Sequence, residues 1–108
     1  MKLALTVSTH AAQFEAVAFK GDLEATFAKL KAWGYDGVEL AIRDPTLVDQ
    51  AGLNASLARY GLTLPAIGTG QAWGEEGLSF TSPDPAIRQA AIERGRSHVP
   101  LAAELGAG

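Results

Sequence analysis

A helix stop and a strand start meet in the segment Gly34-Tyr35-Asp36-Gly37-Val38-Glu39-Leu40. Glycine is common just past the end of a helix, because it adopts the left-handed backbone conformation without steric cost. After the glycine, the apolar residues Val38 and Leu40 flank Glu39 in the two-residue alternation of a β-strand. We therefore predict a helix that ends at Gly34, followed directly by a strand over residues 37–42.

The same order of strand, loop and helix occurs three times along the chain. The predicted strands cover residues 2–8, 37–42 and 63–68. Helix starts are marked by the pairs Asp44-Pro45 and Asp84-Pro85, in which the aspartate caps the helix and the proline takes its first position. Strands that alternate with helices in this way favour an α/β fold with a parallel sheet.

Two prolines and one tryptophan add local expectations. Pro65 has no backbone N–H to donate, so it belongs at the start of the third strand or on a sheet edge. Pro100 lies inside the third helix, where a proline costs about 3 kcal/mol, so we expect the helix to kink or end early there. Trp33 continues the apolar stripe of the first helix and is expected in the core.

Composition limits the classes of protein to which the chain can belong. Its 108 residues are 47% hydrophobic and carry a net charge of −3, which suits one core and a single domain over residues 1–108. The absence of cysteine excludes disulfides and thiolate chemistry. No run of lysine and arginine occurs, which argues against nucleic acid as a partner. No segment is long enough to cross a bilayer, so we expect no membrane partner and a cytoplasmic location.

The two faces of the predicted strands differ in side-chain size. The bulky side chains are expected to pack against the helices. Small or polar side chains then line the opposite face, where Glu39 is a carboxylate in mid-strand. Such a group is rarely buried unpaired, so either an arginine, a lysine or a backbone donor satisfies it, or it belongs to a site. The bulky set is Leu3, Leu5, Val7, Val38, Leu40 and Ile42, and the small set is Ala4, Thr6, Ser8, Glu39 and Ala41.

Polar residues collect just after the three predicted strands. Active sites of βα folds form at the carboxyl ends of their strands, and hydroxyl, amide and imidazole groups there suit a sugar or another polyol. Trp73 would stack on the apolar face of such a ligand. The alternatives are that His10 is an exposed loop residue, and that Arg43 and Asp44 form only a solvated turn and cap. His98 is expected far from these ends, in a structural role. The strand-end residues are Ser8, Thr9, His10, Arg43, Asp44, Thr69, Gly70, Gln71 and Trp73.

The chain resembles the sugar phosphate isomerase/epimerase family in four segments, residues 34–40, 65–72, 75–80 and 102–107. The members are xylose-isomerase-like TIM barrels, a group that also includes the apurinic endonuclease IV enzymes. The resemblance spans the whole chain but only about the first third to half of a usual barrel. It implies three βα units of a parallel (β/α)8 barrel that is incomplete in this sequence.

The resemblance also implies metal-dependent chemistry on a sugar. In such enzymes a divalent metal (Mn, Zn or Mg) binds the sugar oxygens and stabilises an enediolate, while carboxylates move a proton between neighbouring carbons. The metal ligands and catalytic glutamates of the family lie on later strands. The chain is therefore expected to hold no metal and no catalytic residue of its own, and to contribute only substrate-binding residues. These are Glu39, Thr69, Gln71, Trp73 and His10.

The sequence stops after the third helix, where a fourth parallel strand would normally follow. Three parallel βα units leave open edges on the first and third strands, so we expect self-association or domain swapping to close the sheet in a homo-oligomer. Three functions stay open. The first is the N-terminal portion of a sugar or sugar phosphate isomerase or epimerase, inactive by itself. The second is a self-assembling α/β module without catalysis. The third, which the acidic balance disfavours, is a fragment of a DNA repair enzyme like endonuclease IV.

Overall fold

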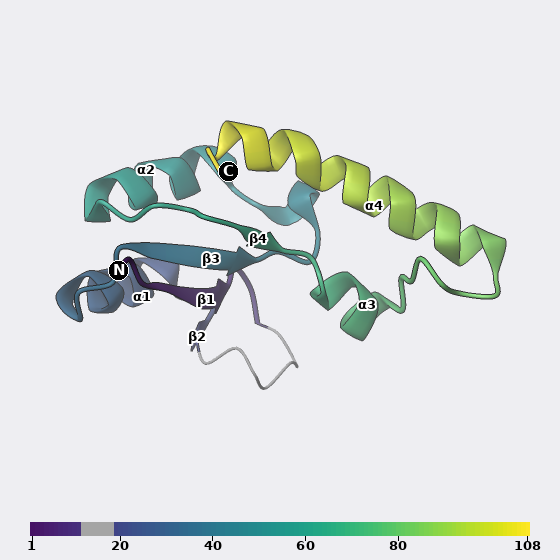
Figure 1. The fold of residues 1–108 in the computed structure, drawn as a ribbon, viewed down its shortest axis with the longest axis horizontal. Coiled ribbons are helices and arrows are strands. Elements are labelled where there is room, and N and C mark those ends of the chain that lie inside the picture. The colour runs from purple at the N-terminus through teal and green to yellow at the C-terminus, as the bar shows by residue number, and fades with distance from the viewer. Residues whose placement is uncertain (12–18) are drawn as a thin grey trace.

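The computed structural model describes residues 1–11 and 19–108, and these form one parallel sheet of four strands in the order β2-β1-β3-β4 (Figure 1). The strands are β1 (Ala4–Ser8), β2 (Phe19–Lys20), β3 (Gly37–Ala41) and β4 (Ile67–Gly68). The helices are α1 (Leu23–Ala32), α2 (Gln50–Tyr60), α3 (Gln71–Glu76) and α4 (Pro85–Glu104), with a short 3-10 helix, η1, over Pro45–Leu47. The predicted α/β class with parallel strands is confirmed.

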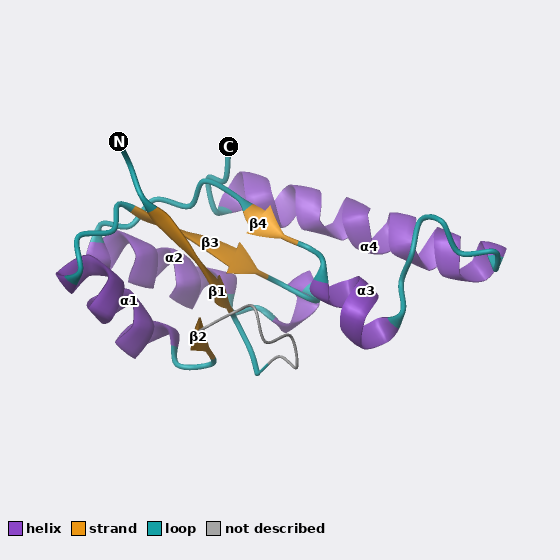
Figure 2. Cartoon of the chain, turned by 60° about the horizontal axis from the view of Figure 1, so that its bottom comes forward, coloured by secondary structure: helices purple, strands orange, loops and turns teal. Residues whose placement is uncertain are grey.

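The core lies between one face of the sheet and helices α1, α2 and α4. Figure 2 shows α1 and α2 side by side on one side of the sheet. Each large apolar side chain that is fully buried contributes about 2 kcal/mol, so this cluster is the main source of stability. It consists of Val7, Phe27, Leu30, Val38, Leu40, Ile42, Leu53, Leu57, Leu62, Leu64, Leu101 and Leu105.

The sheet has one strand more than predicted. β2 pairs in parallel with β1, so one open edge is β2 rather than the first predicted strand. The other open edge is β4, which belongs to the third predicted strand, as expected. The third predicted strand is reduced to β4 and an isolated bridge between Gly37 and Thr63. Pro65 lies between these two pairings, and its missing N–H interrupts the ladder.

Trp33 and Leu3 lie outside the core, so the predictions that placed them against it are wrong. Trp33 is 60% exposed because it is the capping residue after the last turn of α1, and its ring lies 6.0 Å from that of Phe19. Leu3 is 46% exposed, because it precedes the first residue of β1. The expected helix stop at Gly34 is confirmed, since its φ of 84° is in the left-handed region.

Helix α4 runs without interruption from Pro85 to Glu104. Of the two outcomes expected at Pro100, a kink or an early end, the early end is therefore wrong. Pro100 is exposed, and its cost is one missing hydrogen bond to the carbonyl of Arg96. The turn that follows is held by Leu101 and Leu105, which are both buried in the core. Their burial offsets the local cost and carries the helix past the proline.

The molecule is elongated, with extents of 46 × 28 × 27 Å. Figure 1 shows the reason: α4 extends beyond the carboxyl ends of the strands, and its first half projects past α3. The two chain termini lie in the other half of the molecule in this view. Among the helices of residues 1–11 and 19–108, none combines the length and the apolar character that a membrane span requires.

Candidate functional site

The strand register brings a set of small and polar side chains onto one face of the sheet. Thr6 aligns with Glu39, and Ser8 aligns with Ala41, which in turn aligns with Gly68. Residues aligned in this way share a face, and it is the face opposite to the core. We call the surface formed by Thr6, Ser8, Glu39, Ala41 and Gly68 the inner face.

Ser8 and Gln71 form a buried pair at the carboxyl end of the inner face. The side-chain amide of Gln71 donates to Ser8 Oγ over 3.0 Å, and the two residues are 6% and 0% exposed. The Ser8 hydroxyl donates in turn to the carbonyl of His10 over 2.8 Å. Gln71 Oε1 is buried and accepts no hydrogen bond from any described residue. Because an unpaired buried acceptor is destabilising, it indicates a place for an external donor.

His10 lies next to this pair and is half-buried rather than exposed. Its Nδ1 is 3.2 Å from the hydroxyl of Thr9. Its Nε2 is buried and has no hydrogen-bond partner among the described residues. The ring is therefore anchored through only one of its two nitrogens.

Glu39 lies half-buried in the middle of the inner face. No hydrogen bond or ion pair joins it to any other residue of the described ranges. Its carboxylate lies over Gly68, where a methyl group would come 3.2 Å from Oε1. The glycine thus leaves open the space beside the carboxylate. An arginine, lysine or backbone donor that satisfies Glu39 is not found in the described part of the chain.

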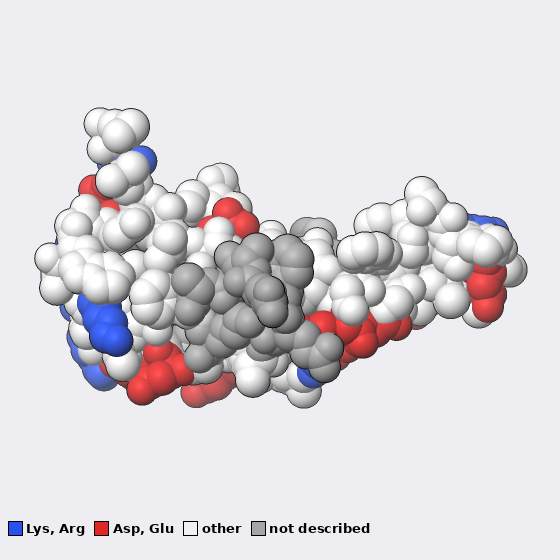
Figure 3. All heavy atoms as spheres, turned by 90° about the horizontal axis from the view of Figure 1, so that it is seen from below, with Lys and Arg blue, Asp and Glu red and all other residues white. Residues whose placement is uncertain are grey.

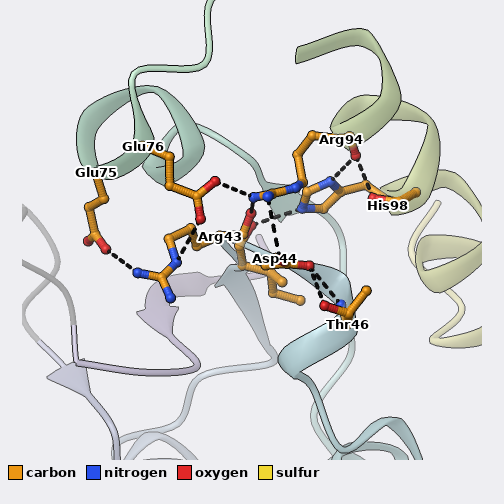
Figure 4. A network of polar contacts seen from close by, with 9 residues as sticks. Arg43, Asp44, Thr46, Glu75, Glu76, Arg94 and His98 are labelled. Atoms are coloured by element: carbon orange, nitrogen blue, oxygen red, sulfur yellow. Dashed lines mark hydrogen bonds and ion pairs between the residues drawn. The ribbon is translucent and has the colours of Figure 1, made fainter. Parts of the chain in front are cut away.

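Two arginines hold α3 against the end of β3 and against α4 (Figure 4). Arg43, two residues after β3, pairs with Glu75 over 3.0 Å and with Glu76 over 3.3 Å. Arg94 of α4 pairs with Glu76 over 2.8 Å and with Asp44 over 3.4 Å. All five side chains are between 13% and 29% exposed. We call these five residues the arginine clamp.

Asp44 serves both as a helix cap and as a member of the clamp. It accepts hydrogen bonds from the backbone N–H of Thr46 over 2.9 Å and from the Thr46 hydroxyl over 2.8 Å. These two bonds, followed by the charges of Arg94 and Arg43, lower the pKa of Asp44 below its ordinary value. Arg43 and Asp44 therefore form ion pairs with α3 and α4 in addition to the turn. The expected helix cap at Asp44 is confirmed.

His98 reaches the end of β3 from α4, so the prediction that it lies far from the strand ends is wrong. It is 5% exposed, with Nε2 2.9 Å from the carbonyl of Ile42 and Nδ1 2.8 Å from the carbonyl of Arg94. Both ring nitrogens are engaged inside the protein, which fits the expected structural role. The long α4 passes the carboxyl ends of the strands and brings His98 there.

Thr69 and Trp73 line a separate hollow of about 250 Å³ between α3 and α4. Its rim carries two aromatic rings, because Trp73 is 70% exposed and Phe80 is 66% exposed. The five residues predicted to bind a substrate therefore fall into two groups. Glu39, Gln71 and His10 lie on or beside the inner face, whereas Thr69 and Trp73 lie in the hollow.

The side chains of residues 1–11 and 19–108 do not fit a divalent metal. No three histidine, aspartate or glutamate side chains gather among them in a way that would hold an ion. The inner face offers one carboxylate, and oxygen-coordinated metals usually need several such ligands. No proton-transfer step through a metal follows from these residues.

Charges of both signs are spread over the described surface. Seen from below in Figure 3, acidic atoms lie on both sides of the grey segment, and most basic atoms lie toward the two ends of the molecule. Nucleic-acid-binding proteins concentrate lysine and arginine on one face. The described atoms in this view form no continuous basic surface.

Comparison with known proteins gives one match to a family. The model of the xylose isomerase-like TIM barrel matches residues 27–108, which is more than half of the chain. The matched residues include β3, β4, the whole arginine clamp, and the inner-face residue Glu39 with the buried Gln71. A search of curated proteins found no match. The parallel strands with helices packed on one face are those of a partial barrel of this kind. The chain belongs to the xylose isomerase-like TIM barrel family.

Proposed function

We propose that the inner face is one wall of a sugar-binding site, in the N-terminal portion of a metal-dependent sugar or sugar phosphate isomerase or epimerase. The observation that carries this proposal is the set of polar groups without partners among the described residues. They are the Glu39 carboxylate, Gln71 Oε1 and His10 Nε2. Sugar hydroxyls donate and accept hydrogen bonds, so a polyol is the ligand class that satisfies all three.

Each of these groups has a distinct role in the proposed site. The Glu39 carboxylate and Gln71 Oε1 accept hydrogen bonds from sugar hydroxyls, and His10 Nε2 completes the contact set. Ser8 and Glu39 lie on neighbouring strands, offset by two residues in register, which corresponds to about 8 Å. Hydrogen bonds from two hydroxyls of one monosaccharide reach across such a distance. Thr69 and Trp73 contribute if the ligand extends into the hollow between α3 and α4.

The chain alone lines a substrate rather than transforms it. A metal would polarise the sugar carbonyl and stabilise the enediolate. The described residues supply no set of ligands for that metal. We therefore expect sugar binding without isomerase turnover by the isolated chain.

A nuclear magnetic resonance titration with D-xylose and D-ribose tests this proposal. The matched variants are Gln71→Ala, in the buried pair, and Gln89→Ala, whose exposed amide contacts Glu93 on α4. Loss of a hydrogen bond at the site should weaken binding by about three- to tenfold in Gln71→Ala. Gln89→Ala should bind like the wild type. A wild-type chain that binds neither sugar, or two variants of equal affinity, would contradict the proposal.

A second candidate function, self-assembly into a homo-oligomer, is favoured by exposed apolar side chains. Trp73, Phe80 and Val99 are 70%, 66% and 68% exposed, and they come from α3, α4 and the loop between them. The edges β2 and β4 also have free backbone groups on one side. A second copy of the chain would cover both features. Light scattering over a dilution series tests this, and a constant monomer mass at the highest concentration would exclude it.

A further inference from the structure

We infer that Arg43, a member of the arginine clamp, is a positioning residue for the inner face. It holds α3 so that Gln71 is presented to Ser8, and it does not itself contact the ligand. The ligand-binding part of this inference rests on the proposed function. The positioning part rests on the contacts of α3 alone.

Helix α3 does not fix its own position. It has 6 residues, and the residue at its N-cap is Gly70, which has no side chain that could accept a hydrogen bond from the first turn. Helices this short are not stable by themselves, so tertiary contacts determine where α3 lies. Those contacts are made at its two ends. Gln71 bonds to Ser8 at the start, and Glu75 and Glu76 bind Arg43 at the finish.

Arg43 has the chemistry for this task. A guanidinium presents its N–H donors in a rigid planar arrangement, so one arginine side chain can form ion pairs with two carboxylates at once. Its backbone is fixed as well, because Arg94 donates to the Arg43 carbonyl over 2.8 Å. The same Arg94 binds Glu76 over 2.8 Å. The last turn of α3 is thus tied to β3 directly and to α4 through a second arginine.

An alternative role for Arg43 and Arg94 would be to bind the phosphate group of a sugar phosphate. The charges of the clamp argue against it, since two guanidinium groups face the three carboxylates of Asp44, Glu75 and Glu76. One negative charge is left over within the clamp. Both arginines are therefore committed to internal carboxylates, and an incoming anion would have to displace them.

The two roles predict different responses to the same substitution. The experiment uses the full chain with D-ribose and with its terminal phosphate ester as probes, and compares Arg43→Met with the wild type. A positioning role predicts that both ligands weaken by the same factor, about tenfold. Anion binding predicts that only the phosphate ester weakens. Arg59→Met is the matched control, because Arg59 pairs with Glu24 between α1 and α2, and should leave both affinities unchanged.

A ligand-free readout tests the positioning part independently. The side-chain amide protons of Gln71 should exchange slowly with water in the wild type, because one of them bonds to Ser8 in a buried position. Their exchange should be faster in Arg43→Met. In Arg43→Lys the slow exchange should be partly restored, because lysine retains the positive charge but lacks the planar guanidinium. Arg43→Lys also serves if Arg43→Met does not fold.

Three results would overturn the inference. The first is unchanged Gln71 exchange in a folded Arg43→Met variant. The second is loss of affinity for the phosphate ester alone. The third is unchanged affinity for both ligands. A wild type that binds no sugar, with Gln71 exchange still dependent on Arg43, would refute the proposed function and leave the positioning role established.

Discussion

At the scale of single residues, Glu39 departs most from ordinary protein interiors. It is half-buried in the middle of a strand, and no described residue pairs with it. A charged group in such surroundings costs free energy unless it is solvated or bound. Its neighbours in the inner face are small, and Gly68 leaves space at its carboxylate. A carboxylate without a described partner, on a face of small side chains, is typical of a binding site rather than of a core.

Gly37 offers a direct test of close packing between β3 and the chain before β4. A methyl group at Gly37 would lie 2.6 Å from Thr63 Oγ1 and 2.7 Å from the Thr63 carbonyl oxygen. Because one of these atoms belongs to the backbone, the strand must move. We expect Gly37→Ala to lower the free energy of unfolding by about 1–3 kcal/mol in urea denaturation.

Gly74→Ala is the matched control for this prediction. Gly74 lies inside α3, and nothing lies within 4 Å of a methyl group placed there. Alanine favours a helix interior over glycine, so this variant should gain up to about 1 kcal/mol. Equal stabilities of Gly37→Ala and the wild type would show that β3 and Thr63 are not in close contact.

At the scale of elements, α4 contains a built-in defect at Pro100. The helix continues past it only because Leu101 and Leu105 are anchored in the core. We expect Pro100→Ala to restore the missing hydrogen bond and to raise the free energy of unfolding by about 1–3 kcal/mol. Pro85→Ala, at the first position of the same helix, should change it by less than about 0.5 kcal/mol. A Pro100→Ala variant that is no more stable than the wild type would mean that α4 is already broken there.

The joint between β3, η1 and α4 should weaken in acid. The pKa of Asp44 is lowered in the folded chain, first by the backbone N–H of Thr46 and then by its hydroxyl, Arg94 and Arg43. A lowered folded-state pKa means that the carboxylate stabilises the fold at pH values above its unfolded-state pKa of about 4. This stabilisation is lost as the pH falls through the folded-state pKa.

The variant Asp44→Asn isolates this contribution, because asparagine keeps the capping oxygen and loses the charge. We expect it to be less stable than the wild type at neutral pH, with a smaller loss of stability on acidification. The measurement is the free energy of unfolding from urea titrations at several pH values. Parallel curves for the two proteins would contradict the assigned role of Asp44.

Helix α3 is an element that the sequence could not predict. The pair Asp84-Pro85 and the glycine stops predict longer elements, because capping is a local property of the sequence. The pair Asp44-Pro45 begins only the three-residue η1, and Asp49 caps α2 instead. Residues 71–76 have no capping side chain and little apolar periodicity, and their helix exists through contacts with Ser8 and Arg43. Those partners are 63 and 32 residues away, so no local pattern reveals them. For the same reason the sequence assigned no role to Arg94.

At the scale of the whole molecule, the alternation of strands and helices was enough to predict a parallel α/β sheet and its core face. The register then follows, and with it the placement of Glu39 on the face opposite to the helices. The two-residue β2 and the shortened β4 were not predictable, because they depend on pairing with β1 and on the break at Pro65. The separation of Thr69 and Trp73 from Gln71 depends on how α3 turns at the strand end. That turn is set by tertiary contacts and not by spacing.

A map of amide chemical-shift changes during titration with D-xylose shows whether a sugar binds on the inner face. We predict that the largest changes occur at the backbone amides of Ser8, Glu39 and Gly68 and at the side-chain amide of Gln71. Changes confined to Thr69, Trp73 and Phe80 would place the ligand in the hollow between α3 and α4 instead. That result, or no change anywhere at saturating sugar, would refute sugar binding on the inner face.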